Sequence, residues 1–330
     1  MKTVSSFSGC TNEDFQAYVL DTKQLVETEL ENLLSNVSDS DLLPLLEYAL
    51  LFRGKRLRPV LAILSAQSVG GVREKVVQLA LSFELLHTAT LVHDDIIDQD
   101  TFRRGREAVH SKWSTNGAIL LGDALIALSV NLAAGYGSRI VKNLSSIGLE
   151  LCNGEYIDVT LSLENATEQD CYVKIGKKSA SLFRGATFCG ALVAGAESSE
   201  LEALGNYGQC FGMAYQLKDD LEDLIHGEQI SQDLKNGNVT LPFLYMHQHG
   251  DSLSRKLLRE NFGNKHVTLS VAQEIRDRME EIGAFTYCQR RIIDYSRKSQ
   301  ESLKGIRDSA FKNFLMRFSM CSDESEAQSR

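Results

Sequence analysis

The amino-acid sequence predicts an all-α protein, and three observations support this. Only three prolines occur among the 330 residues, and no stretch alternates apolar and polar residues as a half-buried strand does. Apolar residues instead recur at helical spacing over long windows. One acidic pattern, two adjacent aspartates and a third three residues after the second, appears twice, each time after an apolar helical run. We therefore expect a single-domain bundle of long helices.

The expected helices follow one another with short breaks. Residues 15–34 form an amphipathic helix, whereas 73–98 and 117–136 are so apolar that we expect them to be buried on most sides. Further helices are expected over about 137–163, 167–195, 199–226 and 240–248, with several shorter ones to about residue 320. No linker divides the chain, so one domain is expected over 1–320, followed by a disordered polar tail over 321–330.

Composition excludes several classes of protein. The net charge of −9 argues against nucleic-acid binding, which normally needs a basic face. No uninterrupted apolar run approaches the ~18 residues of a membrane span, and the start, MKTVSSFSGCTNEDF, resembles neither a signal nor a transit peptide. Seven scattered cysteines indicate reduced thiols, so a cytoplasmic location is expected.

The repeated acidic pattern predicts a metal site. Aspartates four residues apart share one face of a helix, where like charges destabilise it by a few tenths of a kcal/mol. Each triplet also ends a helical run, where the helix dipole disfavours anions, so a merely solvated acidic face fits poorly. Carboxylates without nearby His or Cys suit magnesium, which takes its other ligands from water and phosphate. The triplets are Asp94, Asp95 and Asp98, and Asp219, Asp220 and Asp223.

Cations lie close to the first triplet in the sequence. The segment FRGKRLRP supplies Arg53, Lys55, Arg56 and Arg58, and the pair Arg103 and Arg104 follows the aspartates. Arginine binds phosphate oxygens with two parallel hydrogen bonds, so magnesium and arginines together predict a site for diphosphate esters. No P-loop or GxGxxG pattern is present.

With these motifs in place, the chain resembles the trans-polyprenyl diphosphate synthases, the family of farnesyl and geranylgeranyl diphosphate synthases. The matching segments run in order from GKRLRP through HTATLVHDDIIDQDTFRRG, LLGDAL, KKSASLF and YQLKDDLED to DLKNGNVTLPFLY. The resemblance implies the isoprenoid synthase fold around a deep apolar cavity, usually as a homodimer. It also implies two or three Mg²⁺ ions per active site, with isopentenyl diphosphate and an allylic diphosphate as substrates.

The resemblance also assigns roles to residues. Metal ligands would be Asp94, Asp95, Asp98, Asp219 and Asp223, with Asp220 a weaker candidate. Isopentenyl diphosphate would be bound by Lys55, Arg58, His87 and Arg104. The allylic diphosphate would meet Arg103, Lys178, Ser179, Gln216 and Lys235. A lone histidine in an apolar helix more often has a purely structural role in the core. Only the match to the family pattern makes His87 a candidate for substrate binding.

The chain departs from the family pattern in the loop LIHGEQISQDLKNGNVTLP. Two lysines usually close over the diphosphate there, but Glu228 or Gln229 stands near the first position and Asn238 at the second. Lys235 is the one lysine left in this loop. Either it compensates, or the allylic diphosphate is held more loosely.

Product length is expected to depend on the helix before Asp94. A bulky aromatic four or five residues before that aspartate gives short products in the family, whereas this chain has the small Thr90 and Ala89. Leu86 and Phe83 come next, and the ring of Phe83 is the first candidate floor. We therefore expect geranylfarnesyl diphosphate or a longer product.

Other functions stay open at this point. The enzyme could make geranylgeranyl or farnesyl diphosphate, or be a catalytic or regulatory subunit of a two-chain synthase. A terpene cyclase shares the fold and the first motif but usually replaces the second DDxxD with a longer metal motif. A plain helical scaffold is disfavoured by the paired charge clusters.

Overall fold

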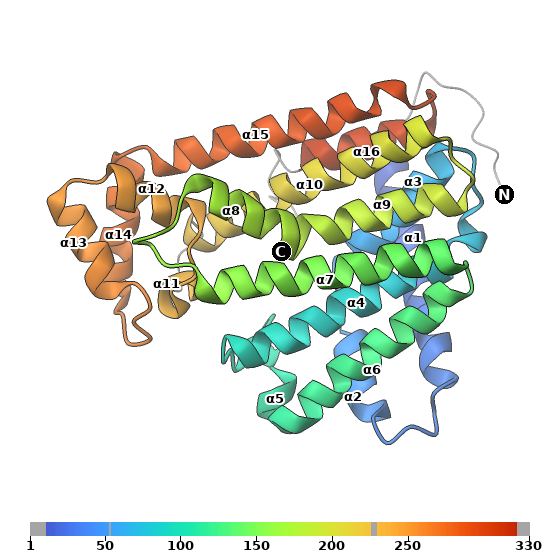
Figure 1. Ribbon diagram of the computed structural model, residues 1–330, viewed down its shortest axis with the longest axis horizontal. Helices are drawn as coiled ribbons and strands as arrows, with labels where there is room; N and C mark the ends of the chain where they lie inside the picture. Colours follow the sequence, from blue (N-terminus) through green and yellow to red (C-terminus); the bar gives the residue numbers. More distant parts are fainter. Residues whose placement is uncertain (1–10, 53, 226–229, 322–330) are drawn as a thin grey trace. The chain divides into compact units, whose positions relative to one another are not determined.

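The computed structural model describes residues 11–52, 54–225 and 230–321. Most of these residues, 78%, are helical, and almost none are in strands (Figure 1). The α-helices and strands are α1 (Asn12–Ser35), α2 (Leu43–Leu50), α3 (Leu57–Ser68), α4 (Val77–Ile97), β1 (Phe102–Arg103), β2 (Arg106–Glu107), α5 (Val109–Lys112), α6 (Thr115–Ala134), α7 (Ser138–Thr160), α8 (Glu168–Ile175), α9 (Ser181–Val193), α10 (Ser198–Ile225), α11 (Gln232–Asn236), α12 (Leu241–His249), α13 (Ser252–Asn261), α14 (Leu269–Glu281), α15 (Ala284–Ser302) and α16 (Ala310–Cys321). Short 3₁₀ turns cover Arg73–Lys75 (η1) and Leu303–Gly305 (η3), and a π-helical turn covers Gly176–Ala180 (η2).

The predicted all-α class is confirmed, and local sequence explains where several helices begin. Thr11 caps α1 and Thr167 caps α8, each exchanging bonds with an aspartate three residues later in a capping box. The Ser114 hydroxyl accepts from the Gly117 amide at the start of α6. The predicted helix over 167–195 contains the π-helical turn η2, and the hairpin β1–β2 is not predicted from apolar spacing.

The described chain divides into two compact units. Unit 1 takes Met1–Gly148, Leu182–Gly208 and Ser302–Arg317, and unit 2 takes Leu149–Ser181, Gln209–Glu301 and Phe318–Arg330. The single domain expected over 1–320 stays a prediction. The expected tail over 321–330 lies outside the described residues except for Cys321, the last residue of α16.

Helix α4 is the core helix of unit 1. It packs against α3 and α6, and α4 and α6 lie side by side (Figure 1). The expectation that 73–98 is buried on most sides holds, because most residues of α4 are enclosed. Bulky side chains such as Phe83, each stabilising the fold by about 1.5–3 kcal/mol, are fully buried.

Helix α6 differs from its prediction. We expected it to be buried, yet only 33% of its apolar window is enclosed. Its apolar residues run all round the helix, and only one side packs on α4. Among the described residues, α6 is the one helix long and apolar enough to cross a bilayer, which by itself is weak evidence for a span.

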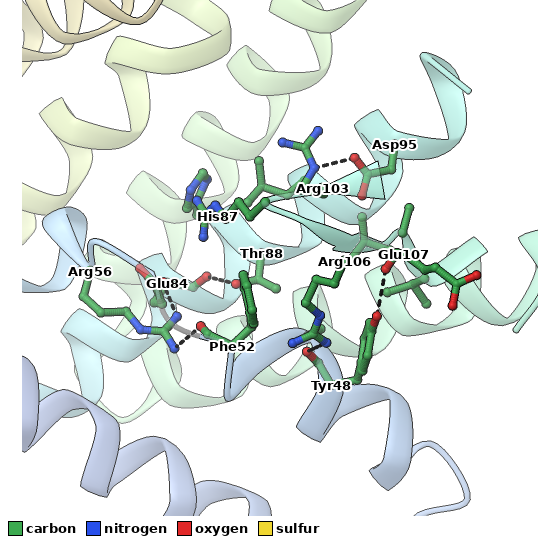
Figure 2. Close-up of a pocket in the computed structure, with 16 residues that line it drawn as sticks. Tyr48, Phe52, Arg56, Glu84, His87, Thr88, Asp95, Arg103, Arg106 and Glu107 are labelled. Carbon is green, nitrogen blue, oxygen red and sulfur yellow. Dashed lines mark hydrogen bonds and ion pairs between the residues drawn. The ribbon is translucent and has the colours of Figure 1, made fainter. Parts of the chain in front are cut away.

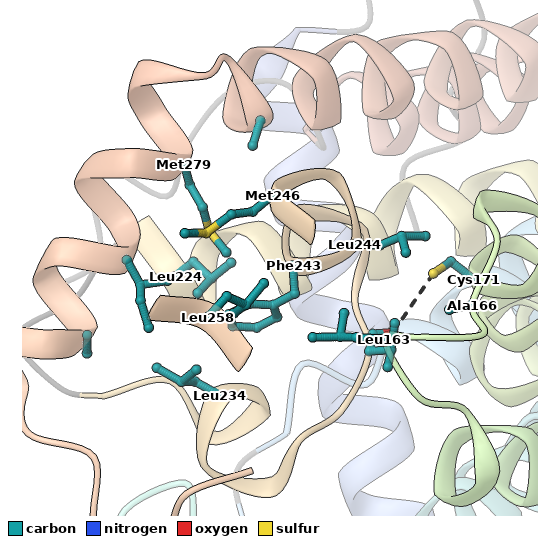
Figure 3. Packing of buried hydrophobic residues seen from close by; sticks show 14 of the residues in the cluster. Leu163, Ala166, Cys171, Leu224, Leu234, Phe243, Leu244, Met246, Leu258 and Met279 are labelled. Carbon is teal, nitrogen blue, oxygen red and sulfur yellow. Dashed lines mark hydrogen bonds between the residues drawn. The ribbon is translucent and has the colours of Figure 1, made fainter. Parts of the chain in front are cut away.

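Unit 2 has its own apolar core. Phe243 lies at its centre among Leu224, Met246, Leu258 and Met279, which come from α10, α12, α13 and α14 (Figure 3). This core supports the C-terminal end of α10, where the second aspartate triplet lies.

Candidate active site

The first aspartate triplet lies where α4 ends. The helix stops at Ile97, and the Asp98 amide donates to the Asp94 carbonyl oxygen at 2.8 Å. Asp94 and Asp98, four residues apart, share one face of this last turn. Asp95 is buried and accepts a bond from the Arg103 guanidinium (Figure 2). Burial raises the pKa of Asp95, and the charge of Arg103 opposes that rise without cancelling it.

A two-residue hairpin turn presents Arg104. The strands pair Phe102 with Glu107 and Arg103 with Arg106, leaving Arg104 and Gly105 as the loop. Both loop residues have positive φ, +52° and +79°. This is the pattern of a type I′ turn, which matches the twist of a hairpin and favours glycine at its second position. Arg103 on the strand and Arg104 at the tip therefore have fixed, different directions.

Arginine charges surround His87. Burial lowers the pKa of His87 well below 6.5, and the charges of Arg58, Arg104, Arg103 and Arg56 lower it further. His87 is consequently neutral at neutral pH. The Arg58 guanidinium lies 4.3 Å from the centre of the Phe183 ring, whereas Lys55 is exposed. In unit 1, two of the predicted isopentenyl-binding residues, Arg58 and Arg104, thus lie close enough to His87 for their charges to act on it.

The predicted chain-length residues occupy different sides of α4. Phe83 is fully buried, and its ring lies 3.0 Å from the position that a Cβ on Gly185 would take. Ala89 and Leu86 are buried, whereas Thr90 is half-buried and donates its hydroxyl hydrogen to the His87 carbonyl oxygen.

In unit 2, Lys178 projects from the π-helical turn η2. Such turns are rare and are often found at functional sites. The Lys178 ammonium contacts Glu155 at 2.6 Å and Asp158 at 2.7 Å, both on α7. The backbones of α7 and η2 meet closely at Gly154, where an added Cβ would lie 2.4 Å from the backbone nitrogen of Lys178. Only glycine therefore permits this crossing.

A hydrogen-bonded chain connects Ser179 to the second triplet. The Ser179 hydroxyl donates to the Gln216 side-chain oxygen at 2.7 Å, and the Gln216 amide donates to Asp220 at 2.8 Å. Burial raises the pKa of Asp220 to about 7, although the charge of Lys174 opposes the rise. Asp220 is buried, whereas Asp219 and Asp223 are exposed.

Lys174 ties this region to α7 and to the segment after α11. Its ammonium bonds Asp158 at 2.8 Å and the Val239 carbonyl oxygen at 2.7 Å. Burial alone would raise the pKa of Asp158, but Lys174 and Lys178 outweigh it and the pKa falls. Burial also raises the pKa of Asp233 on α11, with Asp220 adding to the rise.

The loop after the second triplet is described only in part. Glu228 and Gln229 lie outside the described residues. Lys235 is half-buried on α11, and Asn238 donates to Asp233 at 3.4 Å. Whether Lys235 replaces the two family lysines stays a prediction.

The donor chemistry suits a hard cation. In the described part of the chain, no three His, Cys, Asp or Glu side chains are gathered as a self-sufficient metal-binding group. Asp94 and Asp98 are two carboxylates on one face, and Asp95 is engaged by Arg103. A partial set of oxygen ligands fits Mg²⁺, which keeps several waters and shares substrate phosphates.

Comparison with known proteins identifies the family. Residues 40–279 match the family model described as polyprenyl synthetase. The chain belongs to this family. Polyprenyl synthetases of this kind are prenyl diphosphate synthases, so the protein is a transferase of prenyl groups.

Two curated relatives come from Methanosarcina mazei. A geranylgeranyl diphosphate synthase is 31% identical over 88% of this chain and 92% of its own length. A geranylfarnesyl diphosphate synthase is 32% identical over 67% of this chain and 75% of its own length. Since their identities are so similar, they do not decide the product length of this polyprenyl synthetase.

Solved structures share the fold. The geranylgeranyl pyrophosphate synthetase of Pyrococcus horikoshii matches with a TM-score of 0.86 at 26% identity, covering 95% of this chain and 99% of that chain. The polyprenyl synthase of Caulobacter crescentus, complexed with calcium and isoprenyl diphosphate, matches with a TM-score of 0.86 at 26% identity. The match covers 94% of this chain and 98% of that chain.

Four residues of this synthase that the sequence motifs did not single out belong to the charged network of unit 2: Glu155, Asp158, Lys174 and Asp233. One signal was available, because NGEYID places two acids three residues apart after a glycine. The partners of those acids lie in other helices, so spacing alone could not identify the network.

Proposed function

We propose that this synthase adds isopentenyl diphosphate to an allylic diphosphate in a Mg²⁺-dependent reaction and makes an all-trans product of geranylfarnesyl length or longer. The two aspartate triplets would hold the metal ions. The alternative is a geranylgeranyl or farnesyl product. Of these two, geranylgeranyl diphosphate is favoured by the name of one relative.

The cations around His87 carry the proposal. A neutral imidazole with arginines on several sides is an anion site, and it lies two turns before Asp94 on the helix that supplies the carboxylates. Arg58 and Arg104 each offer a planar fork that fits diphosphate oxygens. Neutral His87 can donate one N–H without adding to the mutual repulsion of these cations.

The residues then divide the reaction between them. Lys55, Arg58, His87 and Arg104 bind isopentenyl diphosphate and orient its double bond. Asp94 and Asp98, and Asp219 and Asp223, would hold Mg²⁺. The bound ions would neutralise the charge of the departing diphosphate. Arg103 and Lys178 add cationic charge where negative charge develops as the allylic carbon–oxygen bond breaks. Buried apolar side chains keep water from the carbocation.

The Lys178 contacts support this role. Glu155 and Asp158 fix the position of its ammonium before substrate arrives, so little rearrangement is needed during the reaction. Ser179 and Gln216 would line the same region through their shared hydrogen bond. We further propose a homodimer, and a cytoplasmic location stays a prediction.

Incubation with isopentenyl diphosphate and primers of increasing length, followed by sizing of the products, tests the proposal. Turnover should require Mg²⁺ and disappear with chelator. Asp94→Ala and Asp219→Ala should each lower kcat roughly a hundredfold or more, because each removes a ligand that acts in the transition state. Asp277→Ala, at an exposed aspartate of α14, is the matched control. Near-normal turnover in either site variant would contradict the two-triplet site.

A further inference from the structure

The two arginine-bearing segments of unit 1 are both attached to the end of α2. The first segment, residues 54–58, carries Lys55 and Arg58, and the hairpin carries Arg103 and Arg104. In each segment one additional arginine, Arg56 or Arg106, points instead to residues 48–52 (Figure 2). We call residues 48–52 the α2 end.

Arg56 is enclosed and fully engaged. It is 4% exposed, and its guanidinium bonds Glu27 and Glu84, each at 2.7 Å. It also donates to the carbonyl oxygens of Leu50 and Phe52. Because these acceptors lie on α1, α4 and the α2 end, one side chain joins three parts of unit 1.

The backbone at Arg56 is strained. Its φ of +50° lies in the left-handed region, which is unfavourable for a residue with a side chain. The conformation sets the direction of the chain between Lys55 and Arg58 and directly precedes α3. The bonds of the guanidinium hold the residue in that conformation. Glu84, one turn before His87 on α4, thereby fixes the loop relative to the histidine.

Arg106 makes the corresponding attachment for the hairpin. Its guanidinium lies 3.3 Å from the centre of the Tyr48 ring and 4.3 Å from that of Phe52. It also donates to the Tyr48 carbonyl oxygen at 2.6 Å. The Tyr48 hydroxyl in turn donates to the Glu107 carbonyl oxygen at 2.9 Å. Since Arg106 pairs with Arg103 across the hairpin, this contact fixes both strands.

We propose that the α2 end is the common anchor of both arginine segments, and that Arg56 and Arg106 are positioning residues that couple the two. This inference rests on the proposed function, because it assigns Lys55, Arg58, Arg103 and Arg104 to the substrates. The C-terminal carbonyl groups of a helix attract cations, so the α2 end suits two guanidiniums. A lysine could not make the several directed bonds of Arg56 or the stacked contact of Arg106.

The test uses Arg56→Lys, Arg106→Lys and the double variant in the full-length protein. Arg56→Lys should raise the KM for isopentenyl diphosphate roughly tenfold and leave the KM for the primer within about twofold, because Arg56 directly holds the segment with Lys55 and Arg58, whereas Arg106 still holds the hairpin with Arg103. Arg106→Lys should raise both KM values, since its hairpin carries Arg103 and Arg104. Arg73→Lys, at a surface ion pair of the same unit, is the matched control.

Coupling is measured by the double-mutant cycle. If both segments share one anchor, the effects of the two substitutions on the KM for isopentenyl diphosphate should not multiply. The fold-increase in KM of the double variant should be at least threefold smaller than the product of the fold-increases of the two single variants. Tyr48→Phe should keep the ring contact and a near-normal KM, whereas Tyr48→Leu should reproduce the effect of Arg106→Lys.

Two results would overturn the anchor: strictly multiplicative effects in the cycle, or lower melting temperatures with unchanged KM values. Failure of the wild type to elongate any primer would count against the proposed function instead. In that event, calorimetric titration with inorganic pyrophosphate compares the same variants, and equal affinities would overturn the anchor independently.

Discussion

At His87 burial, together with the charges of the neighbouring arginines, decides the protonation state. Burial and the neighbouring arginines lower its pKa well below 6.5, so the folded protein holds the neutral form. In the unfolded chain the same imidazole takes up a proton near pH 6.5. Folding therefore excludes a proton, and this contribution to stability is complete above pH 6.5 and lost as the pH falls through the lowered pKa.

We predict that His87→Gln removes this acid sensitivity. The difference in free energy of unfolding, wild type minus variant, should shrink as the pH falls from about 7.5 to 5, by about 1.4 kcal/mol for each pH unit below 6.5 that still lies above the lowered pKa. Urea unfolding at several pH values measures it. A difference that does not change with pH would contradict the neutral state.

Single residues also show what the sequence could not reveal about the site. Spacing predicts that Asp94 and Asp98 share a face, and both lie on the same side of the last turn of α4. It does not predict that Asp95 is buried against Arg103, because that bond depends on the folding back of the hairpin. Glu155 and Lys178 likewise meet only because Gly154 lets α7 and η2 approach.

At the scale of the elements, α4 presents different faces to different neighbours. The His93 ring occupies the space beside Gly122 of α6, and Ala89 lies one turn before it on the same face. Thr90 lies instead four residues before Asp94 and seven after Phe83, in line with both. The Phe83 ring, about 16 Å from Asp94 along the axis, packs over Gly185 together with Ile147.

We therefore predict that Thr90→Phe shortens the product to geranylgeranyl or farnesyl diphosphate at unchanged melting temperature. Ala89→Phe should also shorten it but lower the melting temperature, because the ring must enter the contact with α6. Phe83→Ala should lengthen the product if that ring is the floor. Product sizing with thermal unfolding measures both effects. A wild type that stops at geranylgeranyl would mean that another helix supplies the floor.

Long elements were predictable and short ones were not. Helices such as α4, α6 and α10 repeat the apolar spacing over several turns, which makes the periodicity visible in the sequence. The hairpin has two residues in each strand and the π-helical turn has five, so neither contains a full period. Both carry predicted substrate-binding residues.

At the scale of the whole molecule, the exposed side of α6 is unusually apolar. Ile119, Ile126 and Val130 lie together on one face, beside the buried residues of the helix, and each is between 38% and 42% exposed. Asp123 is the single charged residue of the helix. Exposed apolar patches of this kind mark protein or membrane contacts. The homodimer proposed above would cover this face with a second copy.

We predict that the wild type sediments at about twice its chain mass of 36.7 kDa at micromolar concentration. Ile126→Glu should raise the dimer dissociation constant roughly a hundredfold, because association would then bury an unpaired charge. Leu20→Glu is the matched control, since Leu20 is exposed on α1 of the same unit. Sedimentation equilibrium of the three proteins decides between the outcomes. A wild type at the monomer mass that pellets with lipid vesicles would assign the face to a membrane, and equal dissociation constants in all three would place the dimer contact elsewhere.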